Sequence, residues 1–314
     1  MSRPRQLPAP FATGVFAVRT AKGEDVPMSS LRGLHMPFRG VRSHLEPVTV
    51  AQRYAALALV GPEQVMLSHC SAAVVHGLPV PRGCEHTALH VTTGGPKIRR
   101  PGVVAHRGQR SAVVVGGVPV TCLAETWLDL APFVGLDALV VLGDEVARRL
   151  GGTQRLAALT DRRVPGVRRA REALSWIRVG SKSAMETRSR VLFVRAGLPE
   201  PELNGDIHDR DGGWLATGDL LWREAEVVGE YLGAHHFRDY AQGDSDIVRR
   251  RDVERAGWSH VDFTKDDYYR RPRRLVLLHR LAGLLRCQLD PHGLAEVAAA
   301  PGLPGGPLRP CGGA

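Results

Sequence analysis

Two carboxylates, Asp219 and Glu230, have the spacing of a metal-binding pair on a β-hairpin. The Trp, Leu, Thr, Val and Tyr residues around them predict two strands, at residues 214–222 and 226–232. If the turn is centred at residues 224–225, the two carboxylates lie directly opposite each other, with Cβ atoms about 5 Å apart. Like charges at that distance repel, and a hard divalent cation such as magnesium would relieve the repulsion. The hairpin is therefore a candidate metal platform for phosphate chemistry.

The same two residues have a second interpretation, as solvated charges at the edge of a sheet. Side chains alternate between the two faces of a strand, so a one-residue shift of the turn would place Asp219 and Glu230 on opposite faces. These residues alone leave both interpretations open.

Composition limits the class of protein and the kind of partner. The chain has 314 residues, which favours two domains, and its 43% hydrophobic and 24% charged residues are typical of globular proteins. A net charge of +10 favours an anionic partner, most commonly nucleic acid, although a biased genome also produces an Arg-rich chain.

Five cysteines without C-x-x-C spacing argue against a structural zinc site or a disulfide framework, and favour a reducing cytoplasm. The chain has no apolar run of the roughly 18 residues that a membrane helix needs. Its N-terminus also lacks the apolar core of a signal peptide.

The first domain is predicted to span residues 1–178 and to mix helices with a small sheet. Near its start, Ser29 or Ser30 is expected to cap a short helix, and a strand follows through residues 38–41. This order is typical of a winged-helix module, and a basic surface loop is the alternative. Apolar periodicity predicts further helices at 48–60, 67–78, 124–131 and 136–150, and strands at 87–92, 103–106 and 118–121.

Two histidines of the second of these helices, His69 and His76, are seven residues apart and so share a helix face. That spacing could suit a metal pair, but no third ligand stands near them in the sequence. A role in packing or hydrogen bonding is therefore the expected one.

Basic residues are concentrated between residues 161 and 178. Arg162, Arg163, Arg168 and Arg169 are the candidates for contact with nucleic-acid phosphates, because arginine binds phosphate bidentately. A solvated linker helix is the alternative, since most runs of charge are solvated faces. The domain boundary is predicted to follow directly, at residues 179–181.

The second domain, residues 179–288, is predicted to belong to the α/β class. Ser183 and Glu186 have the S-x-x-E spacing of a capping box, which gives Glu186 a structural role at a helix N-terminus. A strand at 201–208, the hairpin, a helix at 239–256, a strand at 258–263 and a helix at 272–286 follow. This order predicts a mixed sheet flanked by helices. The Pro-, Gly- and Ala-rich segment 289–314 is predicted to be disordered.

Four blocks of the second domain carry a resemblance to known nucleases: SAMETRSRVLFVRAGLPEPELN, GDLLW, GEYLGAHH and DIVRRRDVERAGW. The domain resembles the restriction-endonuclease-like PD-(D/E)xK fold. Within that superfamily, it most resembles the uncharacterised bacterial family related to the very-short-patch mismatch-repair endonuclease. The resemblance implies that Glu186, Asp219 and Glu230 hold a divalent metal, Mg²⁺ or Mn²⁺, with Asp219 and Glu230 as the principal ligands. It also implies that Arg249 positions the hairpin or contacts the nucleic-acid backbone.

Two blocks of the first domain, LSHCSAAVVHGLP and PVTCLAETWLDLA, resemble the antitoxin of abortive-infection type IV toxin–antitoxin systems. The resemblance implies a DNA-binding winged helix at the start of the domain, in a short and degenerate form, and a cognate toxin as a partner.

The hairpin departs from the nuclease pattern at Leu232, where the superfamily usually has a lysine that positions the attacking water. Leucine cannot do this. His235 and His236 follow closely, and His236 is the candidate general base because imidazole accepts protons near neutral pH.

The sequence thus predicts a cytoplasmic, metal-dependent nuclease-like protein that hydrolyses phosphodiester bonds in DNA. A non-catalytic DNA-binding regulator, antitoxin-like and with an inactive nuclease fold, is the rival hypothesis. A protein-interaction scaffold is the third.

Overall fold

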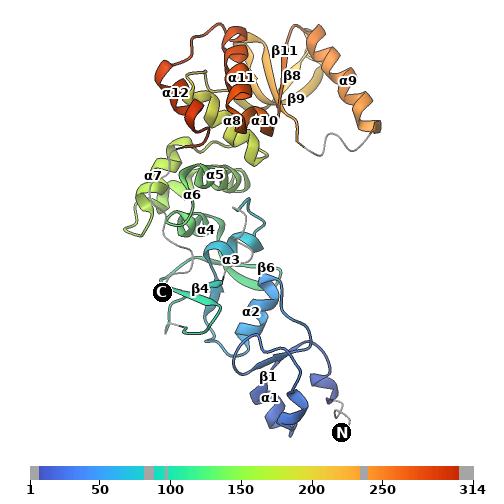
Figure 1. Cartoon of the computed structure of the whole chain (residues 1–314), viewed down its shortest axis with the longest axis vertical. Helices are drawn as coiled ribbons and strands as arrows, with labels where there is room; N and C mark the ends of the chain where they lie inside the picture. The colour runs from blue at the N-terminus through green and yellow to red at the C-terminus, as the bar shows by residue number, and fades with distance from the viewer. Residues whose placement is uncertain (1–6, 81–87, 96–97, 234–239, 304–314) are drawn as a thin grey trace. The chain divides into compact units, whose positions relative to one another are not determined.

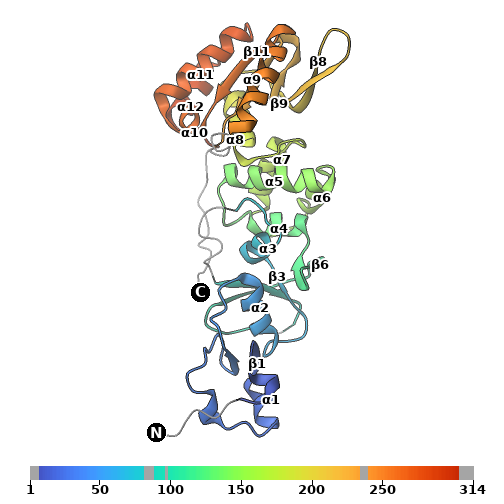
Figure 2. The same cartoon turned by 90° about the vertical axis from the view of Figure 1, so that its right-hand side faces the viewer.

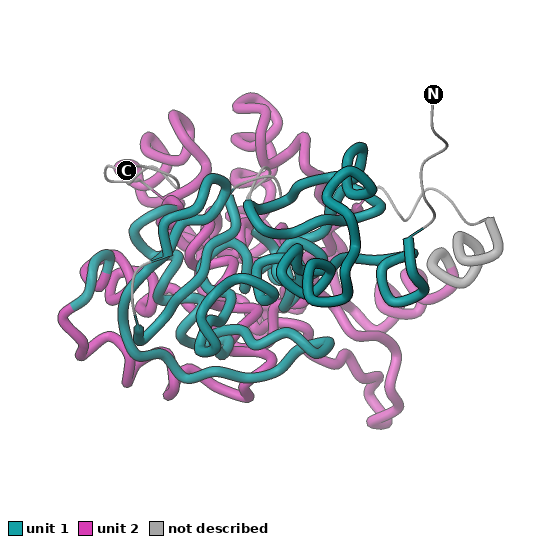
Figure 3. Tube along the Cα trace, turned by 90° about the horizontal axis from the view of Figure 1, so that it is seen from below, with its two compact units in different colours: residues 1–133, 164–166, 309–314 teal, residues 134–163, 167–308 magenta. Residues whose placement is uncertain are grey.

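The computed structural model describes residues 7–80, 88–95, 98–233 and 240–303, and of residues 240–247 it describes the backbone alone. These residues form two compact units (Figure 3). Unit 1 comprises the described residues of Met1–Phe133 and Val164–Gly166, and unit 2 comprises those of Val134–Arg163 and Val167–Leu308. Both units combine helices with sheets, which confirms the predicted α/β class (Figures 1 and 2).

Unit 1 begins with a small antiparallel sheet of β1 (Val15–Ala17) and β2 (Val41–Ser43), with α1 (Val18–Gly23) following β1. The segment predicted to start a winged helix forms a four-residue 3-10 helix, η2 (Met28–Leu31). The predicted serine cap is wrong, because both serines lie inside this helix and Pro27 occupies the N-cap position.

A five-stranded sheet forms the centre of unit 1, in the order β5-β4-β3-β7-β6. Strands β3–β7 and β4–β5 pair in parallel, and the other two pairings are antiparallel. Its core is made of Val, Leu and Ala residues such as Leu67, Val91 and Val120, all fully buried. The elements are α2 (Val50–Ala58), β3 (Val65–Leu67), α3 (His69–Val75), β4 (Leu89–Thr93), β5 (Val103–Arg107), β6 (Ala112–Val115), β7 (Val118–Thr121) and α4 (Leu123–Leu130).

Unit 2 begins earlier than the boundary predicted at residues 179–181, because α5 (Leu136–Leu150) packs on α8 (Ala184–Arg195). The buried carboxylate of Asp144 on α5 joins the two helices, as its Oδ2 accepts a hydrogen bond of 2.8 Å from the Thr187 hydroxyl. It also pairs with Arg190 at 3.2 Å. Helices α6 (Gln154–Leu159) and α7 (Val167–Trp176) lie between α5 and α8 in the chain.

The sheet of unit 2 has four strands in the order β11-β10-β9-β8, and helices cover both of its faces. The antiparallel strands are followed by one parallel pairing, β10 with β11. Residues of α8 and α11 share one core cluster with the sheet, and Val253 of α9 belongs to the cluster on the other face (Figure 1). The elements are β8 (Glu202–His208), β9 (Trp214–Trp222), η4 (Arg223–Ala225), β10 (Val227–Tyr231), α9 (Tyr240–Arg255), β11 (Ser259–Phe263), α10 (Lys265–Tyr269) and α11 (Arg271–Leu284).

The prediction of a disordered tail from residue 289 is wrong at its start, where α12 (Pro291–Ala299) forms. Val297 of this helix is fully buried in the unit 2 core. The side chain of Arg274, also buried, donates a hydrogen bond of 3.1 Å to the carbonyl oxygen of Ala298. The composition of the tail concealed a helix whose stability depends on contacts with distant residues.

Among the described residues, no helix is long and apolar enough to cross a membrane. Cys70, Cys122 and Cys287 are free thiols.

Candidate metal centre

The hairpin of β9 and β10 has the register that a turn centred at residues 224–225 predicts. Its cross-strand pairs are Trp222 with Val227, Leu221 with Val228, and Leu220 with Gly229. A short 3-10 turn, η4, connects the strands, and Glu226 completes it in the left-handed conformation, with φ of 52°. Asp219 and Glu230 are the residues that come next on the two strands, after the last pair, Leu220 with Gly229.

The carboxylate of Asp219 binds the backbone of the neighbouring strand. Its Oδ2 accepts a hydrogen bond of 2.9 Å from the N–H of Tyr231, one residue beyond Glu230. Asp219 therefore joins β9 to β10 at the point where their regular pairing ends. The arrangement fixes this carboxylate beside Glu230 and gives it a structural role as well.

Glu230 lies in a group of three polar side chains on β10 and β11. The parallel register pairs Glu230 with Asp262 and Val228 with His260. Because side chains alternate along strands, Glu230, Asp262 and His260 share one face of the sheet. The imidazole of His260 lies 3.4 Å from a carboxylate oxygen of Glu230 and 3.2 Å from one of Asp262. One ligand atom from each residue lies within 4.8 Å of the others, so the three could hold one metal ion.

The negative charges of Glu230 and Asp262 are balanced by nearby cationic side chains. Burial of the His260 ring opposes its protonation, but hydrogen bonds to Asp262 and Glu230 outweigh burial and raise the pKa of His260 to about 9. The hydrogen bond from His260 in turn lowers the pKa of Asp262. Arg250 of α9 adds a second cation, as its Nη1 donates to Asp262 at 2.5 Å. At neutral pH, protonated His260 and Arg250 therefore offset the charges of the two carboxylates.

The capping box predicted for Ser183 and Glu186 forms in part, because Ser183 caps the helix but the Glu186 carboxylate bonds the N–H of Lys182 and not that of Ser183. The Ser183 hydroxyl accepts a hydrogen bond of 3.1 Å from the Glu186 N–H, and Glu186 Oε2 accepts one of 2.8 Å from the N–H of Lys182. The same oxygen accepts 2.8 Å from the side-chain amide of Asn204 on β8. Since Leu220 pairs with residue 203 and Gly218 with residue 205, Asn204 occupies the strand position beside Asp219. Glu186 thus reaches the hairpin through Asn204 and is not part of the Glu230 group.

The predicted phosphate-binding arginines do not share one helix. Arg162 and Arg163 lie between α6 and α7, whereas Arg168 and Arg169 lie in α7. Arg163 and Arg168 are exposed to solvent. Exposed Arg249 lies on α9.

The predicted general base, His236, lies outside the described residues, as does His235. Leu232 is described: its side chain is half-buried, and its N–H donates to the carbonyl oxygen of Phe263 at 2.8 Å. The lysine position of the hairpin is thus taken up by a residue that extends the pairing of β10 with β11.

Sequence reasoning missed His260 and Asp262, although it predicted their strand. The available signal was the alternation His-x-Asp in Ser259–Phe263, which places the two polar side chains on one face. The alternation does not show that His260 and Asp262 lie beside Glu230. Their proximity depends on the parallel pairing of β10 with β11, which are connected through α9.

Comparisons with known proteins give two relatives and no family. The chain is 28% identical over 251 residues to uncharacterized proteins from two strains of Mycobacterium tuberculosis. The match covers 78% of this chain and 90% of each relative. No family model and no solved structure matches the chain.

Proposed function

We propose that the chain is a metal-dependent nuclease-like protein that hydrolyses phosphodiester bonds in DNA, with its centre on the hairpin of unit 2. One observation carries the proposal: Glu230 pairs with Asp262 across β10 and β11. Asp219 lies one position beyond the last pair of β9 with β10, where its carboxylate accepts from the Tyr231 N–H, so the three carboxylates form a row across three neighbouring strands. Opposed like charges destabilise a sheet, so such a row is favoured where a cation bridges it. The order helix, three strands, helix, strand, helix is that expected of a restriction-endonuclease-like fold, and supports this assignment.

The residues present fit a divalent ion. Glu230 and Asp262 supply carboxylate oxygens, and His260 supplies an imidazole nitrogen, all within 4.8 Å. A mixed oxygen and nitrogen set suits Mn²⁺ better than Mg²⁺, which prefers oxygen ligands alone. When bound, such an ion polarises a phosphate and lowers the pKa of a coordinated water.

The chain's own residues would divide the remaining tasks. Asp219 holds the end of the hairpin through the Tyr231 N–H, which keeps Glu230 in place. Glu186, through Asn204, holds β8 against α8. Arg249 is exposed on the helix that follows the hairpin, where it would contact the phosphate backbone. With leucine at position 232, proton transfer falls to His236, which we propose as the general base.

A second function, that of a non-catalytic DNA-binding regulator, is favoured by a different observation. The carboxylates of the row already have protein partners: Arg250 and His260 for Asp262, and the Tyr231 N–H for Asp219. An inactive nuclease centre would retain such pairing. Leu232, which replaces the lysine that usually positions the attacking water, is consistent with a loss of activity. In this function the chain would resemble a type IV antitoxin, bind DNA through a winged-helix start and its arginines, and have a cognate toxin as its partner.

Cleavage of DNA in the presence of Mn²⁺ tests the first function against the second. Wild type, Glu230→Gln and Asp252→Asn would be incubated with plasmid and with mismatched duplex. Asp252 is the matched control, a carboxylate on α9 that pairs with nearby Arg255 at 3.3 Å. We expect cleavage by wild type and by the control, and a loss of about 10²-fold or more in Glu230→Gln, because the ion contributes several kcal/mol to the transition state.

The alternative outcomes are also informative. Cleavage that persists in Glu230→Gln would contradict the proposed centre. No cleavage, together with DNA binding that weakens steeply with salt, would favour the regulator, since phosphate contacts release counterions.

A further inference from the structure

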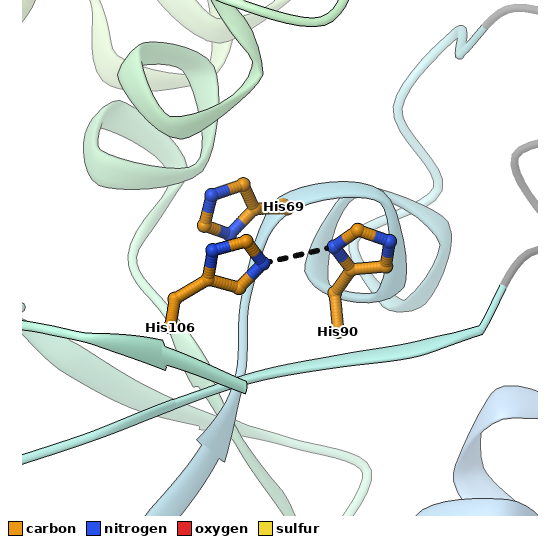
Figure 4. A group of neighbouring side chains, drawn as sticks. All are labelled: His69, His90 and His106. Carbon is orange, nitrogen blue, oxygen red and sulfur yellow. Dashed lines mark hydrogen bonds between the residues drawn. The ribbon is translucent and has the colours of Figure 1, made fainter. Parts of the chain in front are cut away.

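Three histidines of unit 1, His69, His90 and His106, lie against one another in what is called here the histidine cluster (Figure 4). His69 is the first residue of α3, His90 lies on β4 and His106 on β5. The Nδ1 of His90 and the Nε2 of His106 are 3.0 Å apart, and the rings of His69 and His106 stack with centroids 3.6 Å apart. One ring nitrogen from each residue lies within 4.8 Å of the other two.

The pairing of β4 with β5 explains why two of the rings meet. In their parallel register Thr92 pairs with His106, and His90 is two residues before Thr92. Residues two apart on a strand share a face, so His90 and His106 are diagonal neighbours on the same face of the sheet. Helix α3 starts directly after β3, the neighbour of β4, which brings His69 to the same place.

The backbone of His69 has an uncommon conformation at the place where its ring joins the cluster. Its φ of 51° lies in the left-handed region, which few residues other than glycine adopt. Strain of this kind is retained where the surrounding structure requires it, and it is concentrated at functional sites. The ring is also held from outside, because its Nδ1 lies 2.9 Å from the Ser68 hydroxyl and 3.8 Å from Asp129.

We propose that His69, His90 and His106 form a second metal centre for a borderline transition ion such as Zn²⁺, separate from the proposed nuclease centre. Three imidazoles are the protein ligands of one well-known kind of zinc site, with a fourth position left for water or substrate. Half-buried His106 leaves the cluster accessible, whereas His69 and His90 are buried.

The rings need a modest rearrangement to bind the ion. Nitrogens around a tetrahedral Zn²⁺ lie about 3.3 Å apart, given Zn–N bonds of about 2.0–2.1 Å. His90 and His106 are already near that separation, and the ion would replace the hydrogen bond between them. His69 has to turn out of its stack on His106.

The surroundings of the cluster supply the outer contacts that metal-binding histidines use. Ser68 and Asp129 lie on the Nδ1 side of His69, and carboxylate or hydroxyl partners of this kind orient a ligating ring. Asp129 is itself held by Arg110, whose Nε donates to it at 2.9 Å. Phe133 packs edge-on against His69, at 5.4 Å between centroids, and shields this side from water.

Metal binding to the full-length chain, prepared without a histidine tag, tests the proposal. Zn²⁺ binding would be measured by calorimetry, and Co²⁺ would serve as a coloured probe of coordination. The variants are His106→Asn, which changes the most exposed ligand, and His90→Gln. The control is His76→Gln, because His76 is the C-cap residue after α3, outside the cluster, and its Nε2 bonds the carbonyl oxygen of Thr121 at 2.8 Å. All measurements are made in the Glu230→Gln background, which removes one ligand of the proposed nuclease centre.

We expect one Zn²⁺ per chain in the Glu230→Gln protein and in its His76→Gln derivative, and a loss of affinity of at least about tenfold in both cluster variants. X-ray absorption of the bound Zn²⁺ should detect three imidazole nitrogens. This measurement needs no change in the histidine cluster, so it is valid even if a cluster variant does not fold. Absence of binding, binding unchanged by His106→Asn, or fewer than three imidazoles on the ion would each overturn the proposal.

Discussion

Replacing Arg190 by Met should destabilise unit 2 strongly, because this guanidinium is fully buried and pairs with a buried carboxylate. Its Nη2 lies 3.2 Å from Asp144 on α5 and donates to the carbonyl oxygen of Trp176 at 2.6 Å. Its Nη1 donates to Glu200 at 3.0 Å. Met has a similar length and no charge, so the variant removes the pairing and retains most of the packing.

The magnitude follows from what the variant leaves behind. Breaking a buried ion pair by removing one partner costs about 3–5 kcal/mol, because the other charge stays buried without compensation. Asp144 would keep hydrogen bonds of 2.8 Å from the Arg178 N–H and the Thr187 hydroxyl, which places the expected cost near the lower end, about 3 kcal/mol. The double variant Asp144→Asn with Arg190→Met leaves no buried charge and should recover part of this loss.

The loss should also depend on pH in a defined direction. Burial raises the pKa of Asp144, and the charge of Arg190 opposes that rise, so removing Arg190 raises the pKa further. A carboxyl whose pKa is higher in the folded than in the unfolded protein penalises folding at pH values above its folded pKa. The penalty is relieved as the pH falls. The difference between Arg190→Met and wild type should therefore shrink in acid.

Hydrogen exchange of the amides of α5 and α8 is the suitable assay, since a chain of two units need not unfold in one step. The exchange free energies of both helices should fall together in Arg190→Met. A loss below about 1 kcal/mol, or one confined to α8, would refute the inference that the pair joins α5 to unit 2.

Three further predictions follow from the geometry. In the metal-free protein, His260, with its pKa raised to about 9, should contribute stability that is complete below its unfolded pKa of about 6.5 and lost as the pH rises through 9; urea unfolding of wild type and His260→Gln should differ most near pH 6 and converge near pH 10. Gly293→Ala should destabilise unit 2 by roughly 1–3 kcal/mol, because its Cβ would overlap the backbone carbonyl of Arg195, whereas Gly283→Ala, with open space around it, should not; thermal melts would show whether the two variants differ. Arg168→Ala with Arg169→Ala should weaken DNA binding alike for all sequences and flatten its salt dependence, and an unchanged slope in a titration would return these arginines to a solvated face.

Features that depend on neighbouring residues could be predicted from the sequence. The hairpin register was predictable because a short polar connection between apolar strands fixes which residues face each other, and its pairs Trp222–Val227 to Leu220–Gly229 agree. The cap by Ser183 was predictable for the same reason, since Ser183 and Glu186 are three residues apart at the start of the helix. The order of helices and strands in the second domain also follows from local periodicity.

Features that depend on contacts between distant residues were decided by the tertiary structure alone. Asp144 on α5 accepts a hydrogen bond from Thr187 on α8, and this contact places α5 in unit 2, before the predicted boundary. No local sequence pattern indicates that the carboxylate of Asp144 is buried. In the same way, Val297 is apolar in a Pro- and Gly-rich tail, and only its burial against α8 and α11 makes α12 part of the core.

The two candidate metal groups show the same division. The spacing of His69 and His76 suggested a pair on one helix face, but the structure directs His76 to the Thr121 carbonyl and brings His69 to two strand residues. His90 and His106 meet because β4 and β5 pair in parallel, and His260 meets Glu230 because β10 and β11 do. Parallel strands are joined by long crossovers, so their register is set by packing of the whole sheet and not by the connecting turn. The sequence by itself therefore determined most helices and strands of the second domain and the register of the hairpin. The tertiary structure decided which polar side chains come together.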